Sequence, residues 1–149
     1  MEIKKVAIGC DHAGFKHKEV IKLSLIEKGI EVKDYGAFST ESVDYPDFGH
    51  KVAEAVVNGV VDRGIVICGS GNGINITVNK HAGIRSALCW NEEVVKLARQ
   101  HNDANIIALP ARFIDEEKAI RMVKIFLEEK FDGGRHQQRL NKINLSQHC

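Results

Sequence analysis

The sequence predicts an α/β fold in which helices cover both faces of a parallel β-sheet. Short apolar runs alternate with segments of helical periodicity along the chain, and this alternation is typical of parallel sheets. Five runs have the character of buried strands: residues 6–9, 32–34, 65–68, 86–89 and 106–109. The segments between them carry apolar residues at helical spacing: Ile21 and Leu25, Val52 and Val56, Val94, Leu97 and Ala98, and Ile120, Val123 and Leu127.

Length and composition indicate an ordinary globular protein. The 149 residues are 44% hydrophobic and 28% charged, and we expect a single domain over residues 1–149. The formal net charge of +1 excludes bulk electrostatic attraction to nucleic acid or to an anionic membrane. No apolar stretch approaches the length of a membrane span. We therefore expect neither a nucleic-acid partner nor a membrane partner.

The cysteines and the N-terminus indicate the compartment. The four cysteines form neither a Cys-x-x-Cys pair nor a zinc-binding pattern. The first residues lead directly into a strand and lack a signal-peptide pattern. From both observations we expect a cytoplasmic protein with free thiols. Cys10 and Cys89 are expected to act as small buried apolar residues.

The most distinctive motif follows the third predicted strand. The apolar run ends at Cys68, and Gly69, Gly71 and Gly73 follow at alternate positions. Such glycines allow a tight turn whose N–H groups point inward, which suits an anion. The motif differs from the dinucleotide fingerprint, because Ile74 occupies the place of the third glycine, and no phosphate-binding P-loop is present. The sequence thus places a nucleophile or base beside an electrostatic stabiliser.

Three other groups of residues admit both a structural and a functional role. Asp11 is either a helix N-cap with His12 exposed beside it, or part of a ligand site at the carboxyl end of the first strand. His101 lies either in a helix-ending turn or in a site where acid–base chemistry occurs near neutral pH. Arg135 and Arg139 share one face of a helix, either as solvated surface charge or as a grip for a phosphate dianion.

The C-terminal segment is distinct in composition. A break at Asp132-Gly133-Gly134 precedes a polar and basic tail, residues 135–149. A tail with so little apolar content adds little to its own core. We expect it to be a tail or helix that reaches a partner subunit.

The candidate residues fit one type of reaction. Cys68 can act as a base if the loop N–H groups lower its thiol pKa. Ser70 can relay a proton between neighbouring oxygens, and His101 can act as an acid. Arginines can hold a phosphate group. A base, a relay, an acid and a phosphate clamp fit proton transfer next to a carbonyl, with no metal and no organic cofactor. A metal site is disfavoured, since Asp11, His12 and His101 would have to meet without a carboxylate cluster.

Many motifs of the chain resemble one family, ribose-5-phosphate isomerase type B, which also includes galactose-6-phosphate and allose-6-phosphate isomerases. The resemblance runs from Gly9 to about Arg139 in the order of the family. The matching motifs are Asp11-His12-Ala13-Gly14, Ser42-Val43-Asp44-Tyr45-Pro46-Asp47, Ile67-Cys68-Gly69-Ser70-Gly71-Asn72-Gly73, Asn79-Lys80, Gly83-Ile84-Arg85, Arg99-Gln100-His101-Asn102-Asp103 and Gly133-Gly134-Arg135-His136-Gln137-Gln138-Arg139.

This resemblance implies a fold, an assembly and a reaction. The expected fold is a Rossmann-like three-layer sandwich with a five-stranded parallel sheet, and the expected assembly is a homodimer with active sites shared between subunits. Whether dimers pair into tetramers stays open. The expected reaction interconverts ribose 5-phosphate and ribulose 5-phosphate through a cis-enediolate, without a cofactor.

The resemblance also implies roles for individual residues. Cys68 matches the base, His101 the acid that assists ring opening together with Asp11, and Ser70 the hydroxyl that moves the proton between oxygens. Some members use a glutamate just after the glycine loop instead, but Ile74 occupies that place here, which indicates the cysteine branch. His12 and the arginines match the phosphate end, the tail arginines in the site of the other subunit. The positions that match substrate-binding residues are Asp11, His12, Tyr45, Gly69, Ser70, Gly71, Asn72, Gly73, Asn102, Arg112, Arg135 and Arg139.

Three alternatives remain at this point. An allose-6-phosphate or galactose-6-phosphate isomerase would use the same residues with a longer pocket. A non-catalytic flavodoxin-like module would bind a nucleotide or flavin. A thiol redox protein would depend on Cys68, although the missing Cys-x-x-Cys pair is contrary to it.

Overall fold

The computed structural model describes residues 2–145. It contains the five predicted strands, with ends that differ from the prediction by at most two residues: β1 (Lys5–Cys10), β2 (Glu31–Asp34), β3 (Arg63–Cys68), β4 (Ser86–Leu88) and β5 (Ile106–Pro110). The helices are α1 (Phe15–Glu27), α2 (Tyr45–Val57), α3 (Asn72–Val78), α4 (Glu92–Asn102), α5 (Glu116–Glu128) and α6 (Arg135–Ile143), with a short 3₁₀ turn at His12–Gly14. No helix between residues 2 and 145 is both long enough and apolar enough to cross a bilayer.

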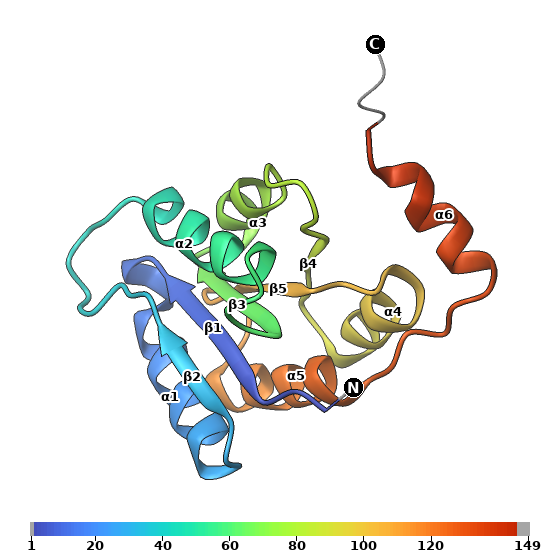
Figure 1. Cartoon of the computed structure of the whole chain (residues 1–149). Coiled ribbons are helices and arrows are strands. Elements are labelled where there is room, and N and C mark those ends of the chain that lie inside the picture. The colour runs from blue at the N-terminus through green and yellow to red at the C-terminus, as the bar shows by residue number, and fades with distance from the viewer. Residues whose placement is uncertain (1, 146–149) are drawn as a thin grey trace.

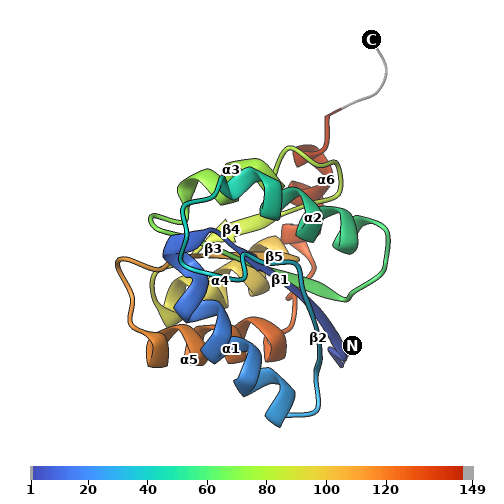
Figure 2. The ribbon, with the colours of Figure 1, turned by 90° about the vertical axis from the view of Figure 1, so that its left-hand side faces the viewer.

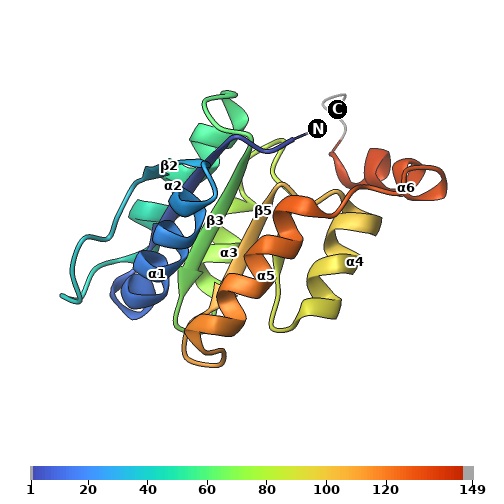
Figure 3. The ribbon, with the colours of Figure 1, turned by 90° about the horizontal axis from the view of Figure 1, so that it is seen from below.

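The five strands form one parallel sheet in the order β2-β1-β3-β5-β4. Helices α2 and α3 cover one face, and α1, α4 and α5 cover the other (Figures 1 and 2). Helix α6 lies outside these layers, beside the end of α4 (Figure 3). The predicted three-layer α/β fold is therefore confirmed.

The two faces of the sheet bury different side chains of the same strand. In β3, Ile65 and Ile67 join the cluster under α1, α4 and α5, whereas Val66 and Cys68 join the cluster under α2 and α3. This alternation follows from the two-residue period of a strand. It places the side chain of Cys68 on the α2–α3 side of the sheet.

Two of the cysteines are structural. Cys10 and Cys89 are fully buried in the larger core cluster. Burial raises the pKa of each thiol to about 12, so both remain protonated at neutral pH. The expectation that they act as small apolar residues is confirmed.

A buried ion pair anchors the segment that leaves β2. Lys18 is completely buried, and its Nζ lies 2.6 Å from Oδ2 of Asp34. Lys22 donates to the same oxygen at 3.0 Å, and the N–H of Gly36 donates to Oδ1 at 2.9 Å. Burial alone would raise the pKa of Asp34, but these hydrogen bonds hold it below its ordinary value. The carboxylate thus ties α1 to the start of the segment 36–44.

We predict that Asp34→Asn lowers the free energy of unfolding by about 3–5 kcal/mol, because it removes the buried carboxylate that pairs with Lys18 and leaves the ammonium only the partly exposed Glu19, whose Oε2 lies 3.1 Å away. Urea denaturation monitored by circular dichroism measures this loss. Lys5→Met is the matched control: it removes the exposed Lys5–Glu31 pair, with N and O 3.5 Å apart, and should cost less than about 1 kcal/mol. Equal losses in both variants would contradict the role of the buried pair.

Candidate active site

A polar cavity of about 370 Å³ opens at the carboxyl edge of the sheet. It lies beyond the carboxyl ends of β1, β3 and β5, which are neighbours in the sheet. This edge is where open α/β sheets bind ligands. All eight lining residues are among those predicted from the sequence: Asp11, His12, Tyr45, Cys68, Gly69, Ser70, Gly73 and Arg112.

Cys68 is the last residue of β3, and its side chain is 4% exposed. Its carbonyl accepts a hydrogen bond from the N–H of Ala111 at 2.9 Å, which ties the end of β3 to the segment after β5. Of the three cysteines within residues 2–145, Cys68 is the one that lines the cavity. The backbone therefore holds this thiol at the cavity wall.

The glycine loop supplies backbone donors beside the thiol. Gly71 has φ of +76°, a left-handed conformation that favours glycine, and it directly precedes α3. Within the described part of the chain, the N–H groups of Gly69, Ser70 and Gly71 have no hydrogen-bond partner. The N–H of Asn72 donates to Oγ of Ser70 at 3.2 Å, which leaves the hydroxyl hydrogen available. Gly71 and Asn72 shape this loop without lining the cavity.

Asp11 caps a helical turn and also lines the cavity. Its Oδ1 accepts from the N–H of Ala13 at 2.9 Å and of Gly14 at 3.2 Å, as an N-cap does. The cap fixes the carboxylate at the cavity wall and leaves Oδ2 for a ligand. Next to it, Nδ1 of His12 accepts from the N–H of Val43 at 3.2 Å. The neutral imidazole therefore carries its proton on Nε2, from which it can donate to a ligand oxygen.

Two glycines of the loop make room for two side chains. A Cβ at Gly73 would lie 2.5 Å from the ring of Tyr45, so only glycine allows the ring to stand against the loop. A Cβ at Gly69 would lie 3.0 Å from Nη1 of Arg112. The N–H of Arg112 also donates to the carbonyl of Gly69 at 3.0 Å. The structure thus brings Tyr45, the first residue of α2, and Arg112, which follows β5, to the same cavity.

The remaining predicted residues lie elsewhere in the same chain. His101 and Asn102 form the last turn of α4, and Arg135 and Arg139 lie on α6. Helix α4 runs back from the carboxyl edge to the amino edge over about 16 Å, at 1.5 Å per residue. Asp103 ends α4 in a left-handed conformation, as the helix-ending turn requires. Within one chain, these four residues therefore do not reach the cavity of Cys68.

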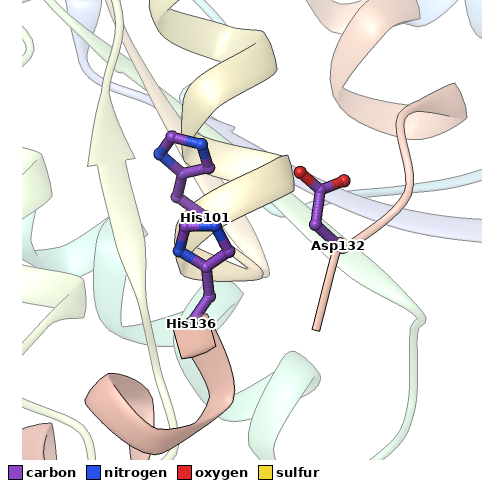
Figure 4. A group of neighbouring side chains, drawn as sticks. All are labelled: His101, Asp132 and His136. Carbon is purple, nitrogen blue, oxygen red and sulfur yellow. The ribbon is translucent and has the colours of Figure 1, made fainter. Parts of the chain in front are cut away.

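His101 is instead part of a cluster with α6, which Figure 4 shows. Its ring stacks on that of His136, with centroids 4.2 Å apart and planes 13° from parallel. Burial of His136, together with the charges of His101 and Arg135, lowers the pKa of His136. Asp132 brings a carboxylate within 4.8 Å of the ring nitrogens. Parallel rings direct their nitrogen lone pairs side by side rather than toward one point, which suits a stack better than metal ligation.

Sequence analysis missed this stack. His136 belongs to the motif from Gly133 to Arg139, and Asp132 to the break before the tail, but nothing in their spacing to His101 indicates contact. The contact depends on the path of the chain from α5 to α6, over residues 129–134.

The comparisons with known proteins agree on one family. The model of the ribose/galactose isomerase family matches residues 6–143. The chain is 48% identical over 141 residues to ribose-5-phosphate isomerase B of Escherichia coli strain K12, covering 95% of each chain. Ribose-5-phosphate isomerase B of Clostridium thermocellum is 51% identical with a TM-score of 0.92, covering 93% of this chain and 94% of that one. The Mycoplasma genitalium enzyme, solved with bound ribulose 5-phosphate, is 39% identical with a TM-score of 0.90, covering 96% of this chain and 95% of that one.

We predict that iodoacetamide at pH 8 alkylates Cys68 at least about tenfold faster than Cys10 or Cys89. The thiolate is the reacting form, and burial keeps the other two thiols protonated and out of contact with solvent. Mass spectrometry of tryptic peptides over time measures each site separately. Equal rates at the three residues would show that the cavity gives Cys68 no special access.

Proposed function

Because the chain belongs to the ribose/galactose isomerase family, we propose that it is an aldose–ketose isomerase that interconverts ribose 5-phosphate and ribulose 5-phosphate. One observation supports the chemistry of this proposal. The Cys68 thiol shares a cavity with the backbone N–H groups of Gly69 and Ser70, which have no hydrogen-bond partner among residues 2–145. This arrangement joins a base to an oxyanion stabiliser.

In the proposed mechanism, Cys68 takes the proton from C2 of the open-chain aldose, and the electrons move to the carbonyl oxygen at C1 to give a cis-enediolate. The N–H groups of Gly69 and Ser70, which line the cavity, would hold the developing oxyanion, each worth roughly 3–4 kcal/mol by analogy with measured oxyanion holes. The Ser70 hydroxyl would pass a proton between the two oxygens. Cys68 then returns its proton to C1, which completes the ketose.

The other residues of the cavity have binding roles in this proposal. The free oxygen of Asp11 would bind a sugar hydroxyl and assist ring opening. Nε2–H of His12 and the guanidinium of Arg112 would donate to the phosphate. Tyr45 would close the side of the pocket against Gly73. The cavity holds no residue that would act as the acid for ring opening besides Asp11 and His12.

We propose that a second copy of the chain completes the site. His101, Asn102, Arg135 and Arg139 lie at the far edge of their own sheet, so in a homodimer they would enter the cavity of the other subunit. A groove of about 470 Å³ along the edge strand β4 supports this assembly. It exposes apolar side chains that a partner would cover: Trp90, Leu97 and Ile143 are 54%, 42% and 56% exposed. The free thiols of Cys10, Cys68 and Cys89 fit a reducing cytoplasm.

We predict that Cys68→Ala lowers kcat for ribose 5-phosphate by about 100- to 10,000-fold, the usual contribution of a general base, and leaves substrate binding largely intact. Assays of kcat/KM with ribose 5-phosphate, allose 6-phosphate and galactose 6-phosphate side by side test the substrate as well. The pentose phosphate should give the highest value. Cys89→Ala, which removes a buried thiol that does not line the cavity, is the control and should keep its activity. Near-normal turnover by Cys68→Ala would exclude the sulfur as the base.

We also predict that two inactive variants restore each other. If the site is shared, a mixed dimer of Cys68→Ala and His101→Asn has one site with both native residues and one site with neither. Random mixing should recover about a quarter of the native activity, because half of the dimers are mixed and half of their sites are intact. Co-refolding followed by a coupled isomerase assay measures the recovery. Mixing Cys68→Ala with Cys68→Ser, as the control, should recover nothing, and the same result for the first pair would contradict shared sites.

A further inference from the structure

Arg85 contacts the end of α4 from the start of the neighbouring strand. Its Nε donates to the carbonyl oxygens of Asn102 at 3.1 Å and of Asp103 at 3.2 Å. Its Nη2 donates to the same Asp103 carbonyl at 3.0 Å and approaches its carboxylate at 3.4 Å. Carbonyls of the last helical turn have no partner within the helix, so Arg85 satisfies groups that would otherwise face water.

The backbone of Arg85 is itself locked to the sheet. Its N–H donates to Oδ1 of Asn105 at 2.8 Å, and its carbonyl accepts from the N–H of Asn105 at 3.0 Å. Nδ2 of Asn105 also donates to the carbonyl of Gly83 at 2.8 Å. These bonds join the starts of β4 and β5. The guanidinium therefore extends from a rigid part of the fold rather than from a free loop.

A second arginine closes the same turn from the other side. Arg99 is 4% exposed, and its Nη1 donates to Oδ1 of Asp103 and to the carbonyl of Ala104, both at 2.8 Å. The carboxylate of Asp103 thus lies between two guanidinium groups. Asp103 also has φ of +46°, the one positive φ of a residue other than glycine within residues 2–145. Such a backbone costs about 1–3 kcal/mol and persists where its surroundings hold it.

His101 depends on this turn for its place. Within the described part of the chain, its side chain makes no hydrogen bond, and its packing partner is the stacked ring of His136. The charged groups around the pair are Asp132, Arg135 and Arg139. The position of the imidazole is therefore set by the stack and by the backbone of residues 101–103. A displacement of about 1 Å at a catalytic group can cost on the order of 100-fold in rate.

We infer that Arg85 is a positioning residue of the isomerase: it holds the carboxyl end of α4, and with it His101 and Asn102, in the geometry that the site of the second subunit requires. This inference rests on the proposed function. It gives a role to the Gly83-Ile84-Arg85 motif, which the proposed chemistry otherwise leaves unused. Arg85 itself lies away from the Cys68 cavity and acts through the turn.

A double-mutant cycle tests the inference. Arg85→Met keeps the length of the side chain and removes its donors, and it should lower kcat/KM for ribose 5-phosphate by about 10- to 100-fold. In a His101→Asn background, the same substitution should cause a clearly smaller loss, because its effect through His101 is already gone and only its effect through Asn102 remains. Arg121→Met, which changes an exposed arginine on α5, is the matched control and should have no effect in either background.

Two further measurements separate positioning from general damage. The pH profile of kcat/KM should change shape in Arg85→Met, since the contribution of His101 changes, whereas loss of folded enzyme would lower every point equally. The rate of Cys68 alkylation should stay close to native, because Arg85 does not line the cavity and a displacement of about 1 Å in the partner's turn leaves the thiol accessible. If Arg85→Met does not fold, Arg85→Lys, which keeps the charge but not the paired donors, enters the same cycle.

The outcomes distinguish this inference from the proposed function. Equal loss in both backgrounds, with an unchanged pH profile, would overturn the positioning role while leaving the isomerase intact. Native activity of Arg85→Met would overturn it as well. If the unmodified protein isomerises none of the three sugar phosphates, the proposed function itself fails.

Discussion

The direction of the strands constrains which residues can meet in this chain. All five strands run the same way, so every segment that follows a strand begins at the carboxyl edge of the sheet. Every helix that returns to the next strand ends at the amino edge. Asp11 and Arg112 follow strands, Cys68 ends one, and all three share one cavity, whereas His101 lies in the last turn of a helix at the opposite edge. The catalytic set proposed here would therefore need two chains to form one site, and that is the physical basis of the proposed dimer.

The cavity owes its chemistry to backbone geometry more than to unusual side chains. Gly71 turns the chain in a left-handed conformation, and the N–H groups of Gly69 and Ser70, two residues that line the cavity, have no hydrogen-bond partner in the described structure. Gly69 and Gly73 then leave the space that Arg112 and Tyr45 occupy. A side chain at either glycine would displace a residue that the proposed mechanism uses. The three alternate glycines thus have separate reasons: Gly71 allows the turn, Gly69 allows the close contact with Arg112, and Gly73 allows the close contact with Tyr45.

Helix α6 illustrates how a polar segment is held without a core of its own. It buries only His136 and Leu140, and it contacts α4 rather than the sheet. The stacked imidazoles join α6 to the same turn that Arg85 and Arg99 hold. His101 and the α6 arginines, which we propose as the acid and the phosphate ligands, would therefore move as one unit. Such an arrangement suits helix α6 if, as proposed, its arginines bind a substrate in the cavity of the other subunit.

The amino-acid sequence determined the strands, the glycine loop and the capping role of Asp11, because apolar periodicity, left-handed turns and helix caps are local. Because strand ends in a parallel sheet share one edge, it also indicated Asp11, His12 and the loop from Cys68 to Gly73, whereas Tyr45 and Arg112 were indicated by the resemblance to the family. Three contacts are known only from the tertiary structure. They are the hydrogen bond from the Val43 N–H that sets the tautomer of His12, the buried ion pair of Lys18 with Asp34, and the hydrogen bond from Arg85 to the Asp103 carbonyl. These contacts join residues 31, 16 and 18 positions apart. Their partners depend on how whole elements pack, which local pattern does not encode.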